Sequence, residues 1–239
     1  MRIAIVSDIH GNLTAFEAVL ADLRETSPDL IFHGGDLADA GASPTEIVDR
    51  IRDLGWPGVA GNTDEMLFDP PSLRRFASQS PQMQPLQPII EEMAAATRAA
   101  LGEDRLAWLS ELPPVQIHAS LALVHASPTS AWRAPAHTAS DTELESVYSP
   151  LGHSVAVYGH IHHSYIRSLP PLTVVNTGSV SLSYDGDRRA SYLLLDDSTP
   201  SIRRVEYDVD RELRALRGRG FPHADWIAKI LASGAPQMP

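Results

Sequence analysis

Cysteine and long apolar stretches are both missing from this sequence. The chain of 239 residues contains no cysteine, which excludes disulfide bonds, thiolate metal sites and a cysteine nucleophile. No segment approaches the roughly 18 consecutive apolar residues that a membrane-spanning helix needs. The N-terminal segment becomes polar at Ser7 and Asp8, which is too early for the apolar core of a signal peptide. We therefore expect a cytoplasmic protein that does not associate with a membrane.

Positive charge is scarce as well. The chain has 19 basic and 30 acidic residues, which gives a formal net charge of -11 at pH 7. This balance argues against general binding of nucleic acid or of membrane surfaces, and no motif for sequence-specific nucleic-acid binding is recognisable. A small phosphorylated or nucleotide substrate is still compatible with the composition, because bound cations can reverse the local field.

No linker, charge block or internal repeat divides the chain. Hydrophobic residues make up 43% of it, which is enough for one core. We predict a single domain over residues 1–239, with a helical insertion at about 66–112 and a C-terminal helical tail at about 208–239. The tip of that tail, residues 232–239, is expected to be loose. The insertion either caps the functional site or simply packs on the sheet, and its exposed face could pair two copies of the chain.

Strand-like and helix-like segments alternate over residues 1–60. The apolar runs Ile3–Val6 and Leu30–Phe32 predict buried strands, and the apolar face of residues 13–23 predicts a helix between them. A second helix is expected to begin at a capping box that Ser43 opens, with proline at its first position. Gly58–Ala60 predicts a third strand. This βαβαβ order predicts a parallel sheet covered by helices.

Strands dominate after residue 113. A short helix near Thr142–Val147, capped by Ser140, interrupts them. Their hairpin-like spacing predicts a second, largely antiparallel sheet packed on the first. The predicted strands are Val115–His118, Leu121–His125, Val155–Tyr158, Tyr165–Ser168, Thr173–Asn176, Ser191–Leu195 and Ile202–Tyr207.

Side chains of the metal-ligand type follow the ends of several predicted strands. Loops at the carboxyl ends of strands in open α/β sheets converge on one crevice, so residues far apart in the chain can meet there. Carboxylate, imidazole and amide ligands together suit manganese, iron or zinc better than calcium. We therefore predict one metal site, which is also the catalytic site, formed by Asp8, His10, Asp36, Asn62, His125, His160 and His162.

Each motif in this set carries little weight alone. A Gly-Asp pair after a strand is usually a turn, and a single histidine at a strand end is usually packed or solvated. The prediction of a metal site rests on all five motifs together. They occur in order, each at a predicted strand end, and chance does not readily explain such a combination. These motifs are Asp8-x-His10, Gly35-Asp36, Gly61-Asn62, His125 and Gly159-His160-x-His162.

In this order the motifs resemble those of the calcineurin-like metallophosphoesterase family, over the chain to about Tyr207. The resemblance implies an α/β fold, namely a four-layer αββα sandwich of two mixed sheets flanked by helices, with two divalent transition-metal ions. Manganese is the first expectation, and iron, zinc, cobalt and nickel are also compatible. By analogy, Asp36 bridges the ions. One ion takes Asp8, His10, Asp36 and His162, and the other takes Asp36, Asn62, His125 and His160.

The activity that this resemblance implies is hydrolysis of phosphodiester or nucleotide phosphoanhydride bonds by a hydroxide that both ions share. Two cations roughly 3.5–4 Å apart can hold phosphate oxygens and neutralise charge during an in-line displacement. Two alternatives stay open: a serine/threonine-type protein phosphatase, and a non-catalytic metal-binding scaffold of the same fold. A scaffold that holds no metal is less attractive, because the seven ligand side chains without metal would form a poorly paired polar cluster.

Thr63 departs from the family pattern, in which a histidine often follows the Gly-Asn pair and assists the leaving group. Threonine cannot deliver a proton as a near-neutral acid, so the leaving group should be stable as an anion. This favours activated phosphodiesters and phosphoanhydrides, whose leaving phosphate has a second pKa of about 6, over alkyl phosphomonoesters and phosphoproteins. A subgroup of small bacterial and archaeal phosphodiesterases that the chain resembles also lacks this histidine.

The remaining candidates carry weaker signals. Asp64 either supports a ligand from behind or is a plain acid at a helix N-terminus. Asn62, Thr63 and His163 are candidates for substrate contacts. His33 is expected to be a packed, hydrogen-bonded residue of its strand.

Overall fold

The first sheet combines two strands from the beginning of the chain with two strands from residues 190–205. In the computed structural model, which describes residues 1–239, β1 (Arg2–Val6) pairs in parallel with β2 and antiparallel with β8, and β8 pairs antiparallel with β9. The strand order is β2-β1-β8-β9, with β2 at Leu30–His33, β8 at Ala190–Asp196 and β9 at Thr199–Val205. The loop after β1 therefore lies beside loops from distant parts of the chain.

The second sheet is mixed. Its pairs β4–β5 and β5–β7 are parallel, and β3–β4 and β6–β7 are antiparallel, so the prediction of a largely antiparallel sheet was wrong. The strands predicted at Ser191–Leu195 and Ile202–Tyr207 were also assigned to the wrong sheet, because β8 and β9 pair in the first one. The chain leaves β4 through α6 (Asp141–Tyr148) before it enters β5, and a crossover of this kind produces parallel pairing. The strand order is β3-β4-β5-β7-β6, with β3 at Val115–His118, β4 at Leu121–Val124, β5 at Val155–Tyr158, β6 at Tyr165–Leu169 and β7 at Leu172–Asn176.

Alternating side chains divide the interior into layers. In β1, Ile5 faces the second sheet, whereas Ala4 faces the helices. In β5, Val157 lies between the sheets, whereas Tyr158 packs on the α6 side. This period of two is what a strand covered on both faces requires. The apolar residues between the sheets form a core of their own, as in other face-to-face sheet packings.

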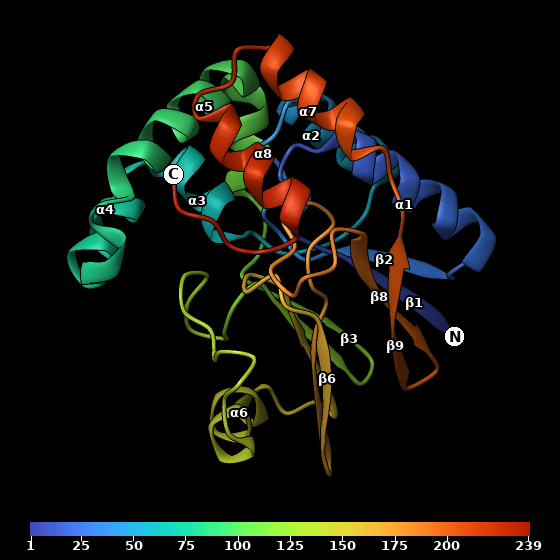
Figure 1. Ribbon diagram of the computed structural model, residues 1–239. Coiled ribbons are helices and arrows are strands. Elements are labelled where there is room, and N and C mark those ends of the chain that lie inside the picture. Colours follow the sequence, from blue (N-terminus) through green and yellow to red (C-terminus); the bar gives the residue numbers. More distant parts are fainter.

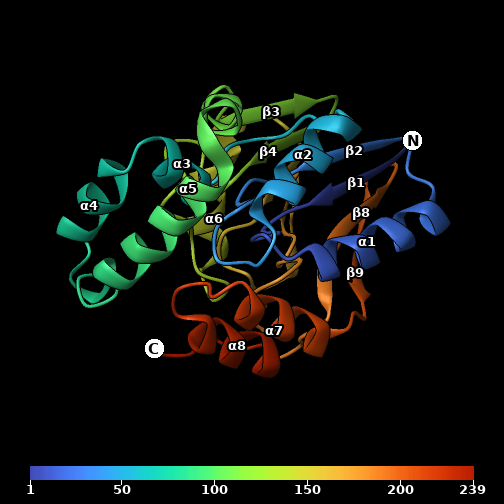
Figure 2. The same ribbon diagram turned by 90° about the horizontal axis from the view of Figure 1, so that it is seen from above.

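Helices cover the outer faces of both sheets, which completes a four-layer αββα sandwich (Figure 1, Figure 2). On the first sheet, α1 (Leu13–Thr26) contributes Phe16 and α2 (Pro44–Leu54) contributes Ile47. On the second sheet, α6 contributes Leu144 and Tyr148, and the short 3-10 helix η2 (Ser149–Leu151) follows it. No helix has the length and apolarity that crossing a membrane requires.

The region expected as a helical insertion contains three helices. They are α3 (Asn62–Phe68), α4 (Pro71–Ser78) and α5 (Gln87–Ser110), with the 3-10 helix η1 (Pro81–Met83) between the last two. Gly102, with φ 71° and ψ 173°, breaks α5 in two. Leu101 and Leu109 pack into the core, whereas Ile90 and Met93 line a cavity that opens beside the strand ends.

The segment Gly58–Ala60 does not form the strand predicted for it. Only Gly58 makes a bridge, to His33 of β2. A side chain is excluded there, because a Cβ on Gly58 would lie 2.2 Å from the carbonyl oxygen of His33. The chain turns into α3 at Asn62, which leaves room for a single bridge. The loop nevertheless ends beside β2, as the predicted strand would have done.

Three smaller predictions also need correction. Ser43 caps α2 without the expected side-chain hydrogen bond. The ring of His33 is buried, but neither of its nitrogens has a hydrogen-bond partner. The C-terminal tail forms α7 (Val209–Gly218) and α8 (Ala224–Ser233), and its tip is partly held, because the indole nitrogen of Trp226 donates to the carbonyl oxygen of Gln237 over 2.7 Å.

Candidate metal centre

The seven predicted ligand residues lie together at one edge of the sandwich. Asp8 and His10 follow β1, Asp36 follows β2 and Asn62 begins α3. His125 follows β4, and His160 and His162 follow β5. Hydrogen bonds and ion-pair distances connect all seven side chains to one another, directly or through a neighbour in the set. The parallel pairs β1–β2 and β4–β5 place these strand ends side by side.

Five of these residues have a strained backbone. Asp8, His10, Asp36, His160 and His162 all have φ between 49° and 65°, the left-handed region that residues with a Cβ rarely adopt. Such a conformation costs of order 1 kcal/mol or more at each position and is concentrated at functional sites. The loops after β1, β2 and β5 therefore adopt an unfavourable backbone conformation that directs these five side chains into the cluster.

The first group of ligand atoms comprises Asp8, His10, Asp36 and His162. Nε2 of His162 lies 3.1 Å from Oδ1 of Asp8 and 3.2 Å from Nε2 of His10. Nε2 of His10 lies 3.7 Å from Oδ2 of Asp36. One ligand atom from each of the four residues lies within 4.8 Å of the others, and all four residues are buried. This arrangement is the first of the two sets that the resemblance implies.

Backbone carbonyls fix the tautomers of these histidines. Nδ1 of His10 donates to the carbonyl oxygen of Asp39 over 3.0 Å, and Nδ1 of His162 donates to that of Leu182 over 2.6 Å. In the neutral imidazoles each Nε2 then carries a lone pair, and the two lone pairs face each other beside two carboxylates. Such a cluster has acceptors without donors, which a cation among them would resolve. The donor set therefore fits a divalent metal ion.

The second group comprises Asp36, Asn62, His125 and His160. Oδ1 of Asn62 lies 3.0 Å from Nε2 of His125 and 2.8 Å from Nδ1 of His160. Nδ1 of His125 donates to the carbonyl oxygen of Gly34 over 2.8 Å, so its Nε2 also faces the cluster. Oδ2 of Asp36 lies 3.4 Å from that Nε2. The same carboxylate oxygen thus lies beside a histidine of each group.

Electrostatics keep the carboxylates of the cluster charged. Burial acts to raise the pKa of Asp36, but the surrounding imidazoles, His125 foremost, hold it well below its usual range. Burial likewise acts on Asp8, and His162 lowers the pKa of that carboxyl. Burial lowers the pKa of His160 to about 4, so this ring is neutral at pH 7. Two buried carboxylates among imidazoles are a suitable environment for a divalent cation.

Asp64 holds the cluster from behind. Its carboxylate accepts the backbone N–H groups of Asp36 (2.8 Å), Leu37 (2.9 Å) and Gly61 (3.0 Å). It is fully buried, and burial raises its pKa to about 6. Asp64 therefore caps α3 and also ties the loop of Asp36 to the loop of Asn62. Asp64 thus fits both interpretations given to it from the sequence: it supports the loop of Asp36 from behind, and it is an acid at a helix N-terminus.

Close approach explains two glycines of the motifs. A Cβ on Gly61 would lie 2.0 Å from Oδ1 of Asp36, and a Cβ on Gly159 would lie 2.2 Å from Oδ2 of Asp8. Both distances are far inside van der Waals contact. Any side chain at these positions would displace a ligand carboxylate, so the glycines are required by the cluster.

Several contributors to the cluster were not anticipated from the sequence. Ser7 donates its hydroxyl to Oδ2 of Asp8 (2.6 Å), the backbone N–H of His160 donates to Oδ1 of Asp8 (3.1 Å), and Ser179 donates to the carbonyl oxygen of Asp8 (2.8 Å). The carbonyl oxygens that orient the histidines belong to residues without a ligand-type motif. Residue type gives no signal for a backbone carbonyl, so only the coordinates reveal these partners.

The candidate substrate-contact residues have different positions. The hydroxyl of Thr63 is buried and has no hydrogen-bond partner, and its backbone N–H donates to Oδ1 of Asp36 over 2.8 Å. Thr63 and Asn62 line a cavity of about 280 Å³ that opens onto the ligand cluster. His163 is not among the residues that line this cavity; its ring stacks on His137, with ring centroids 3.8 Å apart.

Comparison with known proteins agrees with this geometry. A crystal structure of a metallophosphoesterase from Sphaerobacter thermophilus is 26% identical, covers 98% of this chain and 100% of its own, and has a TM-score of 0.80. An uncharacterized protein of Methanocaldococcus jannaschii is 28% identical over 97% of this chain and 98% of its own. A symmetrical bis(5'-nucleosyl)-tetraphosphatase of Aromatoleum aromaticum is 28% identical over 62% of this chain and 52% of its own.

The family assignment follows from the sequence match together with the fold. Residues 1–199 match the calcineurin-like phosphoesterase superfamily domain. This span contains all seven ligand-type residues and both sheets up to the start of β9. The chain therefore belongs to the calcineurin-like phosphoesterase superfamily, a metal-dependent family.

Proposed function

We propose that this protein hydrolyses phosphodiester or phosphoanhydride bonds of a small phosphorylated or nucleotide substrate, with two divalent cations at the ligand cluster. The observation that carries the proposal is the position of Asp36. Its Oδ2 lies 3.7 Å from Nε2 of His10 and 3.4 Å from Nε2 of His125, between two groups of buried donor atoms. A carboxylate in that position suits a ligand shared by two ions.

The two ion sites would use the two groups described above. Asp8, His10, Asp36 and His162 would hold one ion, and Asp36, Asn62, His125 and His160 would hold the other. The mixed oxygen and nitrogen ligands favour manganese, with iron, zinc, cobalt or nickel as alternatives. When bound, such a pair lowers the pKa of water and neutralises charge on phosphate oxygens during an in-line displacement.

The residues of the chain would orient the cluster and position the substrate. The carbonyl oxygens of Gly34, Asp39 and Leu182 hold three imidazoles in the ligand tautomer. Asp64 fixes the two loops that carry Asp36 and Asn62. Thr63 lines the cavity and its hydroxyl has no protein partner, so this side chain is the candidate for a contact with a phosphate oxygen.

The cavity lacks an imidazole that is free to protonate a leaving group, which supports a leaving group of low basicity. The imidazoles that line it belong to His10, His160 and His162, and all three are proposed ligands. Burial raises the pKa of Tyr184, another lining residue, to about 12, which makes it a weak acid at pH 7. Without an imidazole free to protonate the leaving oxygen, a phosphate or aryl oxide leaves more readily than an alkoxide.

The relative from Aromatoleum aromaticum supports the phosphoanhydride branch by its name, a bis(5'-nucleosyl)-tetraphosphatase. That alignment covers 52% of the relative, so its substrate enters here as a candidate. A phosphodiester and a dinucleoside polyphosphate are thus the two substrates to compare first.

A turnover panel tests the proposal. The purified chain is stripped with a chelator, reloaded with manganese, and assayed on bis(p-nitrophenyl) phosphate, a dinucleoside tetraphosphate, an alkyl phosphomonoester and a phosphoserine peptide. We expect the diester or the anhydride to be turned over fastest. His125→Ala should abolish this activity and leave the circular dichroism spectrum unchanged. His153→Ala is the matched control, because His153 precedes β5 and lies at the opposite end of that strand from His160.

The same panel separates the two other functions. Faster turnover of the phosphoserine peptide than of any diester or anhydride would support a protein phosphatase and overturn the proposal. A protein that binds manganese but turns over none of the four substrates would instead be a non-catalytic metal-binding scaffold of the same fold.

A further inference from the structure

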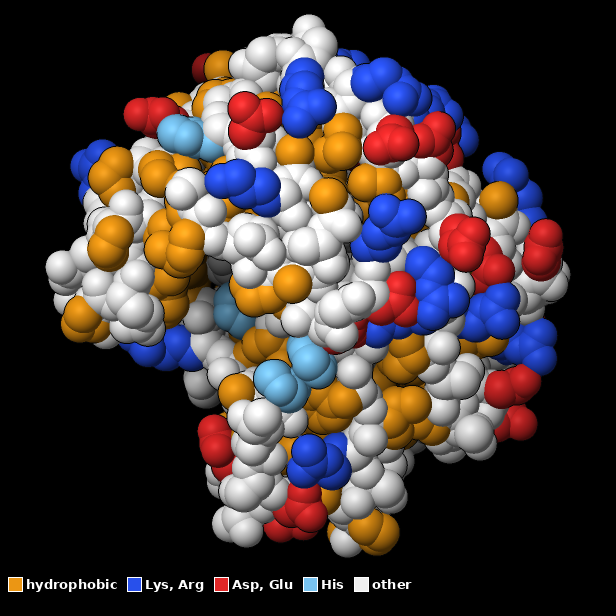
Figure 3. Space-filling view, in the orientation of Figure 1, with side chains coloured by type: hydrophobic (Ala, Val, Ile, Leu, Met, Phe, Trp, Pro, Cys, Tyr) orange, Lys and Arg blue, Asp and Glu red, His pale blue; other side chains and the backbone are white.

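The cavity beside the ligand cluster has apolar walls. Thirteen of its 20 lining residues are hydrophobic, and five of the other seven are proposed metal ligands, so polarity is confined to one end. Leu73 and Phe76 come from α4, Ile90 comes from α5 and Trp226 comes from α8. Figure 3 shows the opening as a hollow below the helices, with hydrophobic side chains along its rim and a histidine at its inner end.

The indole N–H groups of the walls and the carboxyl group of Asp39 are already bound to protein. The indole N–H of Trp132 donates to Oε2 of Glu65 over 2.9 Å, and that of Trp226 donates to the carbonyl oxygen of Gln237 over 2.7 Å. Asp39 accepts the hydroxyl of Thr97 over 2.6 Å. Both tryptophans therefore present carbon faces to the cavity, and their N–H groups are not available to read the edge of a nucleobase.

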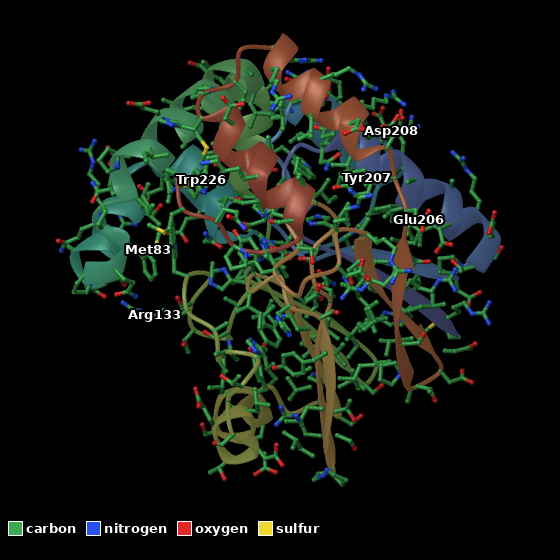
Figure 4. The ribbon with its side chains drawn as sticks, viewed as in Figure 1. Met83, Arg133, Glu206, Tyr207, Asp208 and Trp226 are labelled. Atoms are coloured by element: carbon green, nitrogen blue, oxygen red, sulfur yellow. The ribbon has the colours of Figure 1, made fainter.

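Positive charge is also absent from the lining. None of the 20 lining residues is lysine or arginine. Arg133, which follows the lining residue Trp132, lies over the ring of Phe76 at 5.1 Å, and its guanidinium donates to Gln79 and Ser80. Figure 4 shows Arg133 and Met83 at the same end of the opening, with Trp226 farther along on α8. A second or third phosphate in this cavity would have no cationic side chain beside it.

We infer that this cavity binds an uncharged, apolar organic group of the phosphoester substrate, while the phosphate of that substrate lies at the ligand cluster. The inference rests on the proposed function and narrows it to phosphodiesters with a hydrocarbon or aryl substituent. An apolar protein cavity of about 150 Å³ holds one benzene molecule. The volume of about 280 Å³ found here therefore accommodates a naphthyl group or an alkyl chain of comparable size.

A series of p-nitrophenyl alkyl phosphodiesters tests this inference, because the leaving group stays constant while the alkyl group grows from methyl through butyl to octyl. We expect kcat/KM of the manganese-loaded protein to rise with chain length, by up to about fourfold for each methylene that becomes fully buried, the ratio equivalent to about 0.8 kcal/mol. The rise should stop when the cavity is full.

Two variants make the test specific. Trp226→Ala should lower kcat/KM for the octyl ester by about tenfold or more, since it removes an indole from the wall, and should change the methyl ester little. Trp108→Ala is the matched control, because Trp108 is also a half-buried indole on a helix but does not line the cavity. It should keep the wild-type dependence on chain length.

Binding of alkylphosphonates separates this inference from the proposed function. If no ester is hydrolysed but octylphosphonate binds more tightly than methylphosphonate in calorimetry, the cavity inference stands and the proposed function fails. If the methyl ester is hydrolysed and longer chains bring no gain, the cavity inference is refuted and the proposed function stands. A nucleoside p-nitrophenyl phosphate that outperforms the octyl ester would also refute it.

Discussion

Replacing His33 by leucine would change how the stability of this protein depends on pH. The imidazole is fully buried in β2, packs against Trp108 with ring centroids 6.3 Å apart, and has no hydrogen-bond partner at either nitrogen. Burial alone lowers its pKa from 6.5 to about 4. Protonation of the folded protein at this ring is therefore opposed, whereas the unfolded chain accepts the proton freely.

The sign and size of the effect follow from this difference. Above pH 6.5 the ring is neutral in both states, so the full stability is present. As the pH falls through 6.5 toward 4, the unfolded chain gains a proton that the folded protein does not, and the free energy of unfolding decreases. The fall of the pKa from 6.5 to about 4 corresponds to about 3 kcal/mol in total, of which about 2 kcal/mol is lost between pH 7 and pH 5.

Urea unfolding at pH 7 and pH 5 in the presence of a chelator measures this contribution. Far-ultraviolet circular dichroism is the appropriate probe, because Trp108 lies against the mutated site. The wild-type protein should lose about 2 kcal/mol more than His33→Leu between the two pH values, and His153→Leu should behave as wild type. Equal losses for the wild type and His33→Leu, within about 0.5 kcal/mol, would refute the reasoning.

Three further substitutions address the ligand cluster. Asp64→Asn should lower the free energy of unfolding by about 1–3 kcal/mol and weaken manganese binding by about tenfold or more, measured by urea unfolding and calorimetry; unchanged values would show that its three N–H contacts are dispensable. Gly61→Ala should abolish manganese binding, because its Cβ would lie 2.0 Å from Oδ1 of Asp36. Gly218→Ala is the control, because its Cβ meets no atom within 4 Å, and this variant should bind manganese normally. Normal binding by both variants would contradict the steric argument. Thr63→His should raise turnover of alkyl phosphomonoesters relative to diesters, by about tenfold or more if the ring acts as a general acid; a ratio that does not change would remove the leaving-group argument.

The candidate ligand set could be named from the sequence, because residue type marks the strand ends. Asp8, Asp36 and His125 each follow a short apolar run, and parallel pairing of those runs brings their ends together. The shared position of Asp36 came from a family resemblance, and the distances from Asp36 to His10 and His125 agree with it. Spacing alone would not have distinguished which residues lie in which group.

Other features could not be predicted because they depend on backbone geometry or on distant partners. The second sheet was expected to be largely antiparallel, since strand spacing does not reveal that α6 returns the chain in parallel. The strand expected at Gly58–Ala60 is reduced to one bridge by the turn into α3. The apolar cavity is formed by α4, α5 and α8, which come from separate parts of the chain, so no local pattern indicates it.

Metal stoichiometry tests the central claim most directly. Calorimetric titration of the metal-free protein with manganese, checked by elemental analysis after gel filtration, should give two ions per chain, as a site of two cations requires. His125→Ala should retain one ion, and Asp36→Asn, which alters the carboxylate proposed to be shared, should weaken both. A wild-type protein that binds a single ion, or an Asp36→Asn variant that binds two ions with wild-type affinity, would contradict the account.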